Sequence, residues 1–110
     1  MATKNKYIIL TDENFQQEVL DSAGPILVDF FVSWKGASQI MVPIIVELAV
    51  EFEGKIKVGR MDVDNNSQIP SMYGIRKIPT FMLFKKGEVV DQVVGMARKI
   101  ELVEKLNNLF

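Results

Sequence analysis

The 110-residue chain has the length of one domain, 1–110, and its 48% hydrophobic and 25% charged residues are typical of a globular protein. Its formal net charge of −1 gives no reason to expect a nucleic-acid or membrane partner. The sequence contains no cysteine and no histidine, which excludes disulfides, cysteine nucleophiles, Cys/His zinc sites and Ser-His-Asp triads within the chain, and we expect no metal and no cofactor.

Two features bear on where the protein is found. No apolar run approaches the roughly 20 residues that are needed to span a bilayer. The stretch Met1 to Lys6 is polar and lacks the apolar segment of a signal peptide. We therefore expect a cytoplasmic protein, and we expect it to be a monomer.

The first part of the chain predicts a strand, a helix and a second strand. Residues 7–10 are apolar and favour a strand, and Thr11 suits the N-cap of the helix that follows. Gly24-Pro25 ends that connection. Residues 26–31 form a short run of branched and aromatic side chains, which is typical of a buried parallel strand.

A turn separates this second strand from a helix predicted over residues 37–52. Pro43 lies inside this helix and should kink it, and Gly54 should close it. Ser38 suits an N-cap, and we interpret it as one because the chain has no histidine to activate it as a nucleophile. Apolar side chains recur at helical spacing at Met41, Ile44, Ile45, Leu48 and Phe52.

Three further strands are predicted in the second half of the chain. Residues 55–62 alternate between polar and apolar side chains, which favours a strand. Residues 80–84 and 89–94 are two more apolar runs, and Lys86-Gly87 between them favours a tight turn. The last two strands should therefore form an antiparallel hairpin.

Two helices complete the prediction. A short one begins at Ser67 and ends at Gly74, and the last one spans residues 98–109. The order βαβαβαββα predicts an α/β fold with a parallel section and an antiparallel edge. The apolar stripe of the last helix is predicted at Ile100, Val103, Leu106 and Phe110.

Several short motifs, in this order and spacing, resemble the thioredoxin family over nearly the whole chain. The resemblance implies the thioredoxin fold, an α/β domain with a central mixed sheet flanked by helices. The family consists of protein-disulfide oxidoreductases that act in electron transport. The motifs are Leu27-Val28-Asp29-Phe30, Tyr73-Gly74-Ile75-Arg76, Ile78-Pro79-Thr80, Phe84-Lys85-Lys86-Gly87-Glu88 and Val94-Gly95.

The turn that carries the family's chemistry is altered. In the family it reads Trp-Cys-Gly-Pro-Cys, and here it reads Trp34-Lys35-Gly36-Ala37-Ser38. Lys35 thus stands at the first cysteine position and Ser38 at the second. From these replacements we predict that the protein is not an enzyme but a redox-inactive binding or scaffold module.

Three other interpretations stay open. The chain is alternatively a diverged or engineered variant of an active thioredoxin whose cysteines have been replaced. Lys35 is alternatively the nucleophile of a lysine-based catalyst, which would need a desolvated pocket. The protein is alternatively a scaffold designed or evolved for stability, with no partner.

The resemblance also implies roles for two polar residues. Asp29 matches a buried aspartate that moves protons for the family's second cysteine, and here we interpret it as an inherited feature. A carboxylate in a central apolar strand costs desolvation energy unless it is paired. Arg60 stands where the family has a lysine near this aspartate, so it is the candidate partner of Asp29.

Ile78-Pro79 matches the family's cis-proline loop, which pairs its backbone with an extended peptide. We therefore expect a shallow groove for a protein or extended peptide. Five cations surround it, at Lys35, Arg76, Lys77, Arg98 and Lys99, which favours a partner with acidic side chains unless they are ordinary surface charges. The predicted binding residues are Trp34, Lys35, Gly36, Ala37, Arg76, Lys77, Ile78, Pro79, Gly95 and Met96.

Overall fold

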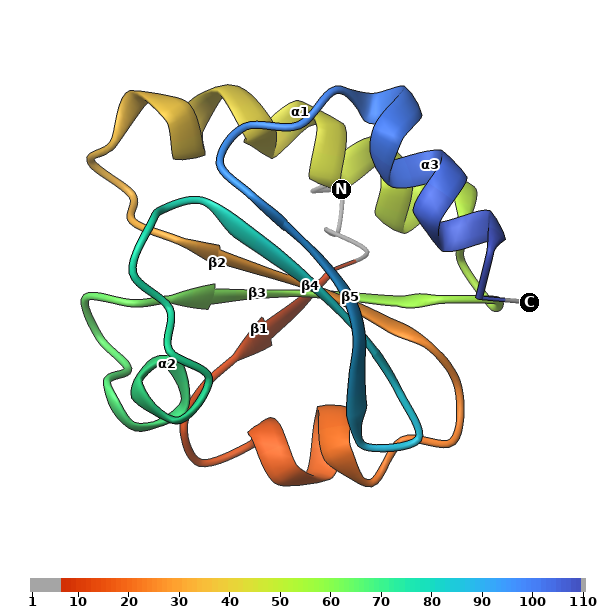
Figure 1. The fold of residues 1–110 in the computed structure, drawn as a ribbon, viewed down its shortest axis with the longest axis horizontal. Helices are drawn as coiled ribbons and strands as arrows, with labels where there is room; N and C mark the ends of the chain where they lie inside the picture. The colour runs from red at the N-terminus through yellow and green to blue at the C-terminus, as the bar shows by residue number, and fades with distance from the viewer. Residues whose placement is uncertain (1–6, 110) are drawn as a thin grey trace, which may run out of the picture.

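A computed structural model describes residues 7–109, which form a five-stranded mixed sheet with helices on both faces (Figure 1). The strand order is β1-β3-β2-β4-β5, in which β1, β3 and β2 are mutually parallel and β4 runs antiparallel to β2 and β5. The strands are β1 (Ile8–Leu10), β2 (Ile26–Phe31), β3 (Lys57–Asp62), β4 (Thr80–Lys85) and β5 (Glu88–Val94).

The helices divide between the two faces of the sheet. Helices α1 (Gly36–Glu51) and α3 (Lys99–Asn107) lie together on one face, at the top of Figure 1. The π-helical segment η1 (Gln16–Leu20) and α2 (Gln68–Met72) lie on the other. The predicted thioredoxin fold is thus confirmed, with an irregular π-helical turn where a regular first helix was expected.

Each face of the sheet has its own apolar core, because side chains alternate along a strand. Leu27 of β2 packs with Ile45 of α1 and Leu106 of α3. On the opposite face, Val28 packs with Phe15 and Phe84. Of the apolar positions predicted in α1, Met41, Ile45, Leu48 and Phe52 are buried and Ile44 is partly buried.

Some predicted boundaries shift for local reasons. The third strand begins at Lys57 and not at Lys55, because the N–H groups of Lys55 and Ile56 both donate to the Phe52 carbonyl and continue the turn after α1. The hairpin turn at Lys86-Gly87 has φ values of 53° and 81°, which match the type I′ turns favoured by strand twist. Phe110 and the stretch 1–6 lie outside the described residues.

The start of α1 differs from the prediction. Lys35 is its N-cap residue, with extended backbone, and its side chain makes no capping hydrogen bond. Ser38 therefore lies inside the first turn, where it is buried. The interpretation of Ser38 as the N-cap is wrong, because the helix begins at Gly36, two residues before it.

Side chains elsewhere do stabilise helix starts. Thr11 Oγ1 accepts a hydrogen bond from the Asn14 N–H at 3.1 Å in the turn before η1, although the N-cap residue of η1 itself is Phe15. Ser67 precedes α2 but makes no side-chain cap. The Asp12 carboxylate caps that helix instead, by accepting hydrogen bonds from the N–H groups of Gln68 and Ile69 at 3.1 and 2.9 Å.

The apolar stripe of α3 is rotated from the one predicted. Leu102 and Leu106 are fully buried, whereas Ile100 is 55% exposed. Ile100 precedes Leu102 by two positions, which places it about 200° around the helix. Among residues 7–109, none of the helices combines the length and the apolar character that crossing a membrane requires.

Candidate functional site

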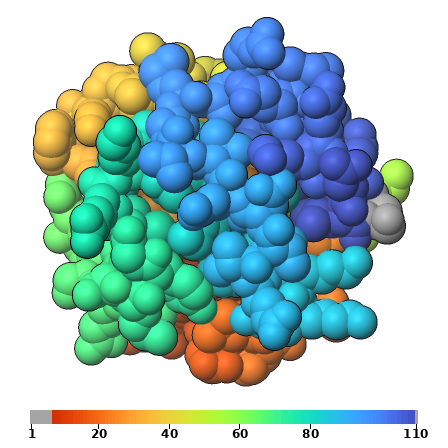
Figure 2. Space-filling model, viewed as in Figure 1, coloured from red at the N-terminus to blue at the C-terminus, as the bar shows by residue number. Residues whose placement is uncertain are grey.

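Three loops meet at one end of the sheet. Thr80, the first residue of β4, pairs with Phe30 of β2 and with Val94 of β5. The turn after β2, the loop before β4 and the residues after β5 therefore lie at the same end. Figure 1 shows this convergence, and in Figure 2 the three segments adjoin on the surface.

The loop before β4 is tied to the end of β5. The Ile78–Pro79 peptide bond is cis, and the Gly95 N–H donates to the Pro79 carbonyl at 2.7 Å. Gly95 has a φ of 90°, a conformation that L-residues rarely adopt. Pro79 is buried, Ile78 is half-buried and Met96 beyond Gly95 is exposed.

Trp34 is held in place by a residue that sequence reasoning missed. Its indole Nε1–H donates to Asp64 Oδ2 at 2.7 Å, yet the side chain is 71% exposed. Asp64 lies in the turn after β3, and its own N–H donates to Asp62 Oδ1. Because these residues are 30 positions apart, no local sequence signal indicates the contact.

The two family cysteine positions have opposite environments. Lys35 is exposed, as is Gly36, and Ala37 is half-buried. Ser38 is 1% exposed, and its Oγ accepts a hydrogen bond from the Val32 N–H at 3.2 Å. The turn therefore exposes the Lys35 side chain to solvent and buries the Ser38 hydroxyl.

Asp29 lies buried beneath the turn, in the middle of β2. Its Oδ2 accepts a hydrogen bond from Arg60 Nε at 2.9 Å, which confirms the predicted pairing. Its Oδ1 has no hydrogen-bond partner within the described chain. Burial raises the pKa of Asp29 to about 6, against the opposing effect of the Arg60 charge.

A second contact of Arg60 was not predicted. Its guanidinium carbon lies 3.8 Å from the centre of the Phe31 ring, within the range of cation–π attraction. Phe31 follows Asp29 by two positions and so points to the same face of the sheet. That alternation is the signal from which the contact could have been found.

The five predicted cations do not form one set. Lys35, Arg76, Lys77 and Arg98 are exposed, as a docking surface requires, and Arg98 remains 81% exposed although its Nε lies 3.8 Å from Glu101 Oε1. Lys99 instead forms ion pairs with Glu47 and Glu51 of α1, at 2.9 and 2.6 Å. The interpretation of Lys99 as a groove cation is therefore wrong, because its charge bridges α3 to α1.

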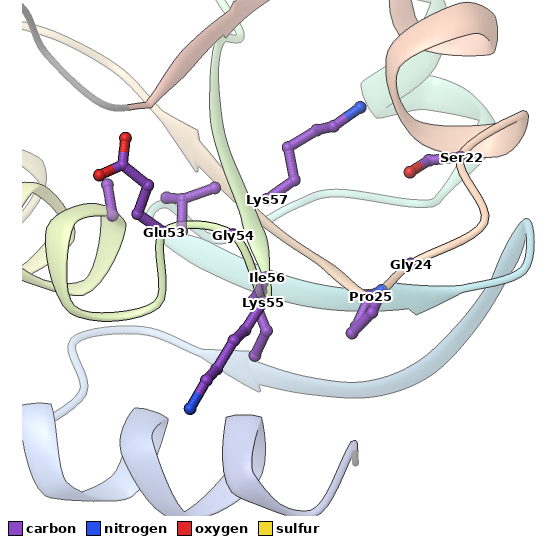
Figure 3. Close-up of a pocket in the computed structure, with 10 residues that line it drawn as sticks. Ser22, Gly24, Pro25, Glu53, Gly54, Lys55, Ile56 and Lys57 are labelled. Atoms are coloured by element: carbon purple, nitrogen blue, oxygen red, sulfur yellow. The ribbon is translucent and has the colours of Figure 1, made fainter.

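Cavities lie beside the predicted groove and away from it. One of about 310 Å³ runs along the cis-proline loop and is lined by Ile75, Arg76, Lys77, Thr80 and Val94, among others. Figure 3 shows another, of about 360 Å³, between Pro25 and Lys57 at the starts of β2 and β3. This second cavity lies at the end of β2 opposite the Trp34 turn.

Comparisons with known proteins agree with this geometry. A family model described as Thioredoxin matches residues 6–108. A protein named Thioredoxin from Rickettsia bellii is 48% identical over 99 residues, which cover 90% of this chain and 94% of the relative. A protein named Thioredoxin 1 from a Nostoc species is 50% identical over 97 residues, which cover 88% and 91%. The chain belongs to the thioredoxin family.

Membership in this family corrects one prediction. We expected a protein that is not an enzyme, and that expectation is wrong because the chain belongs to a family of enzymes. A third relative, from Chlorobaculum thiosulfatiphilum, is also named Thioredoxin and is 45% identical over 102 residues, 93% of this chain and 94% of the relative. These relatives point to a family of protein-disulfide oxidoreductases, and the missing cysteines do not remove the chain from it.

Proposed function

We propose that this chain is a diverged or engineered thioredoxin, with Lys35 and Ser38 at the cysteine positions, that binds an extended segment of a protein partner. The segment lies across the Trp34–Ser38 turn, the cis-proline loop and Gly95-Met96. Thioredoxins act on proteins, which supports a protein partner. A monomeric state and a cytoplasmic location stay predictions.

The arrangement of the loops around Trp34 is the observation that best supports the proposal. The Gly95–Pro79 hydrogen bond joins two of the three loops that meet at the end of the sheet. Beside them Trp34 offers a largely exposed ring that Asp64 holds in one orientation. An ordered aromatic side chain loses little conformational entropy when a partner covers it. These contacts support a peptide site that does not require the cysteines.

The charge around the loops favours an acidic partner. Lys35 stands on one side of Trp34, and Arg76 and Lys77 precede Pro79, all of them exposed. Arg98 adds a further exposed cation just past Met96. Such charges raise the rate of association with an acidic segment more than they slow its release, and salt screens them.

The test uses the fluorescence of Trp34, the single tryptophan of the chain. A short peptide of alternating valine and glutamate is titrated into the protein at low and at moderate salt. We expect saturable binding that weakens with salt. The same peptide with lysine in place of glutamate should bind at least about tenfold more weakly, because it meets like charges.

A matched pair of variants separates the loops from the rest of the surface. Lys35→Glu with Lys77→Glu reverses two charges at the loops, and Lys55→Glu with Lys86→Glu reverses two exposed charges far from them. The first pair should weaken binding of the valine–glutamate peptide and the second should not. Equal weakening by both pairs, or no saturable binding of the parent chain, would contradict the proposal.

A further inference from the structure

Arg60 is a buried cation with donors that the rest of residues 7–109 do not use. Its side chain is 9% exposed, and its Nε–H is the group that donates to Asp29. Within residues 7–109, the two terminal amino groups of Arg60 make no hydrogen bond. These groups carry four N–H donors in a rigid planar fork. A fork with unused donors favours an acceptor beyond those that residues 7–109 supply.

The fork borders a cavity of about 330 Å³ along β1, β3 and the end of β2. This volume lies at the lower end of ligand pockets, which span about 300–1,000 Å³. The Tyr7 and Phe31 rings lie 5.6 and 3.8 Å from the guanidinium carbon and form two of its walls. Ile9, whose side chain is exposed, adds apolar surface, whereas the Leu10 side chain is buried in the core of the opposite face.

The other polar residues that line the cavity already have partners inside the protein. The Asp62 carboxylate accepts hydrogen bonds from the Asp64 N–H and from Asn65 Nδ2, at 3.0 and 2.6 Å. The Asn66 amide accepts from the Asp12 N–H and donates to the Asp62 carbonyl. Arg60 is therefore the residue that offers strong donors to a ligand.

We propose that this cavity binds a small organic monocarboxylate with an aromatic or apolar body, held by the terminal amino groups of Arg60. A carboxylate matches the planar guanidinium fork with two parallel hydrogen bonds. The body of the ligand would lie against Tyr7, Phe31 and Ile9. This site uses residues other than those of the proposed peptide site, so either can fail alone.

The charges nearby restrict the ligand to a single negative charge. Asp29 is bonded to the Nε side of Arg60, and the Asp62 carboxylate also borders the cavity. Both carboxylates disfavour added negative charge. A phosphate dianion should therefore bind more weakly than a monocarboxylate, although it also suits the arginine fork.

The experiment titrates the full chain with benzoate and follows its backbone amides by NMR. We expect saturable shifts at Leu10, Phe31 and Asn65, with a dissociation constant on the order of 1 mM for so small a ligand. Benzamide, which lacks the charge, and inorganic phosphate should each bind at least about tenfold more weakly. Absence of saturable shifts with benzoate, or equal affinity for either comparison compound, overturns the proposal.

Two variants test the role of Arg60 in binding, and both are chosen so that the protein still folds. Arg60→Met alone would leave Asp29 buried without its partner, which is strongly destabilising. Asp29→Asn with Arg60→Met avoids this and should lose benzoate binding. Asp29→Asn alone keeps the guanidinium and should bind at least as tightly as the parent. Equal binding by the two variants would also overturn the proposal.

Discussion

The two faces of the sheet differ in what is buried in addition to their aliphatic side chains. On the face covered by η1 and α2, the rings of Phe15, Tyr73 and Phe84 contact one another with centroids 5.4 to 5.8 Å apart. On the face covered by α1, Asp29 and Arg60 are buried among apolar side chains. Both faces have apolar cores, and the second face also holds a buried ion pair beneath the candidate site.

The largest expected effect on stability is that of a substitution on the face covered by η1 and α2. Phe84→Ala should lower the free energy of unfolding by about 3–5 kcal/mol, because it removes a buried ring from contact with two others. Urea unfolding measures the change, and Phe84→Leu is the control that keeps most of the volume. A loss below about 1 kcal/mol would show that these rings do not carry the stability of that face.

The buried ion pair gives the next largest effect, with the opposite sign. The pKa of Asp29 is raised from 3.8 to about 6, so folding disfavours its charged form. Well below pH 3.8 both states hold the proton and there is no penalty. Between pH 4 and 6 the unfolded state loses its proton first, so stability falls as pH rises, and above pH 6 the penalty is constant.

Asp29→Asn should therefore stabilise the protein at neutral pH, by up to about 3 kcal/mol. The gain should shrink as pH falls from 6 towards 4 and vanish only below pH 3.8, where Asp29 of the parent is protonated in both states. Thermal melting of the two proteins from pH 4 to pH 8 measures this. Destabilisation at neutral pH would show instead that pairing with Arg60 more than offsets the desolvation of Asp29.

A smaller effect is expected where Asp64 orients Trp34. Asp64→Ala removes the acceptor of the indole N–H, so Trp34 should lose its fixed orientation. The valine–glutamate peptide should then bind about fivefold more weakly, equivalent to one hydrogen bond of about 1 kcal/mol. Asp64→Asn is the control, since it removes the charge but keeps an acceptor. Equal affinities for the two variants would mean that the contact does not orient the ring for binding.

The smallest effect concerns Lys99. Its ion pairs with Glu47 and Glu51 join α3 to α1 at the surface, and surface pairs contribute little to stability. Lys99→Met should lower the melting temperature slightly and leave peptide binding unchanged. A clear loss of peptide binding, with the melting temperature kept, would return Lys99 to the set of groove cations.

The elements of the fold could be predicted because their signals are local. Apolar side chains alternate along the strands and recur at helical spacing in α1, and Lys86-Gly87 marks the hairpin. The pairing of Asp29 with Arg60 was predicted through the family resemblance. The same resemblance placed the three loops at one end of the sheet, where the strand register puts them.

The details that failed depend on residues brought together by folding. Asp12 caps α2 across 56 positions, and Lys99 reaches Glu51 across 48, so no window of sequence contains either contact. Ser38 is buried in the first turn of α1 because the helix begins at Gly36. The residues around the turn do not by themselves indicate which of them begins the helix. The functional class was wrong because two missing cysteines were given more weight than the family shared by the whole chain.

The most direct test of a thioredoxin frame with replaced cysteines is to restore them. In Lys35→Cys with Ser38→Cys, the first thiol would stand at the N-terminus of α1, which lowers a thiol pKa, and the second would lie buried in its first turn. The variant should form an intramolecular disulfide and reduce insulin with dithiothreitol faster than the parent chain does. Failure of the two cysteines to form a disulfide in the folded protein would contradict a retained redox geometry.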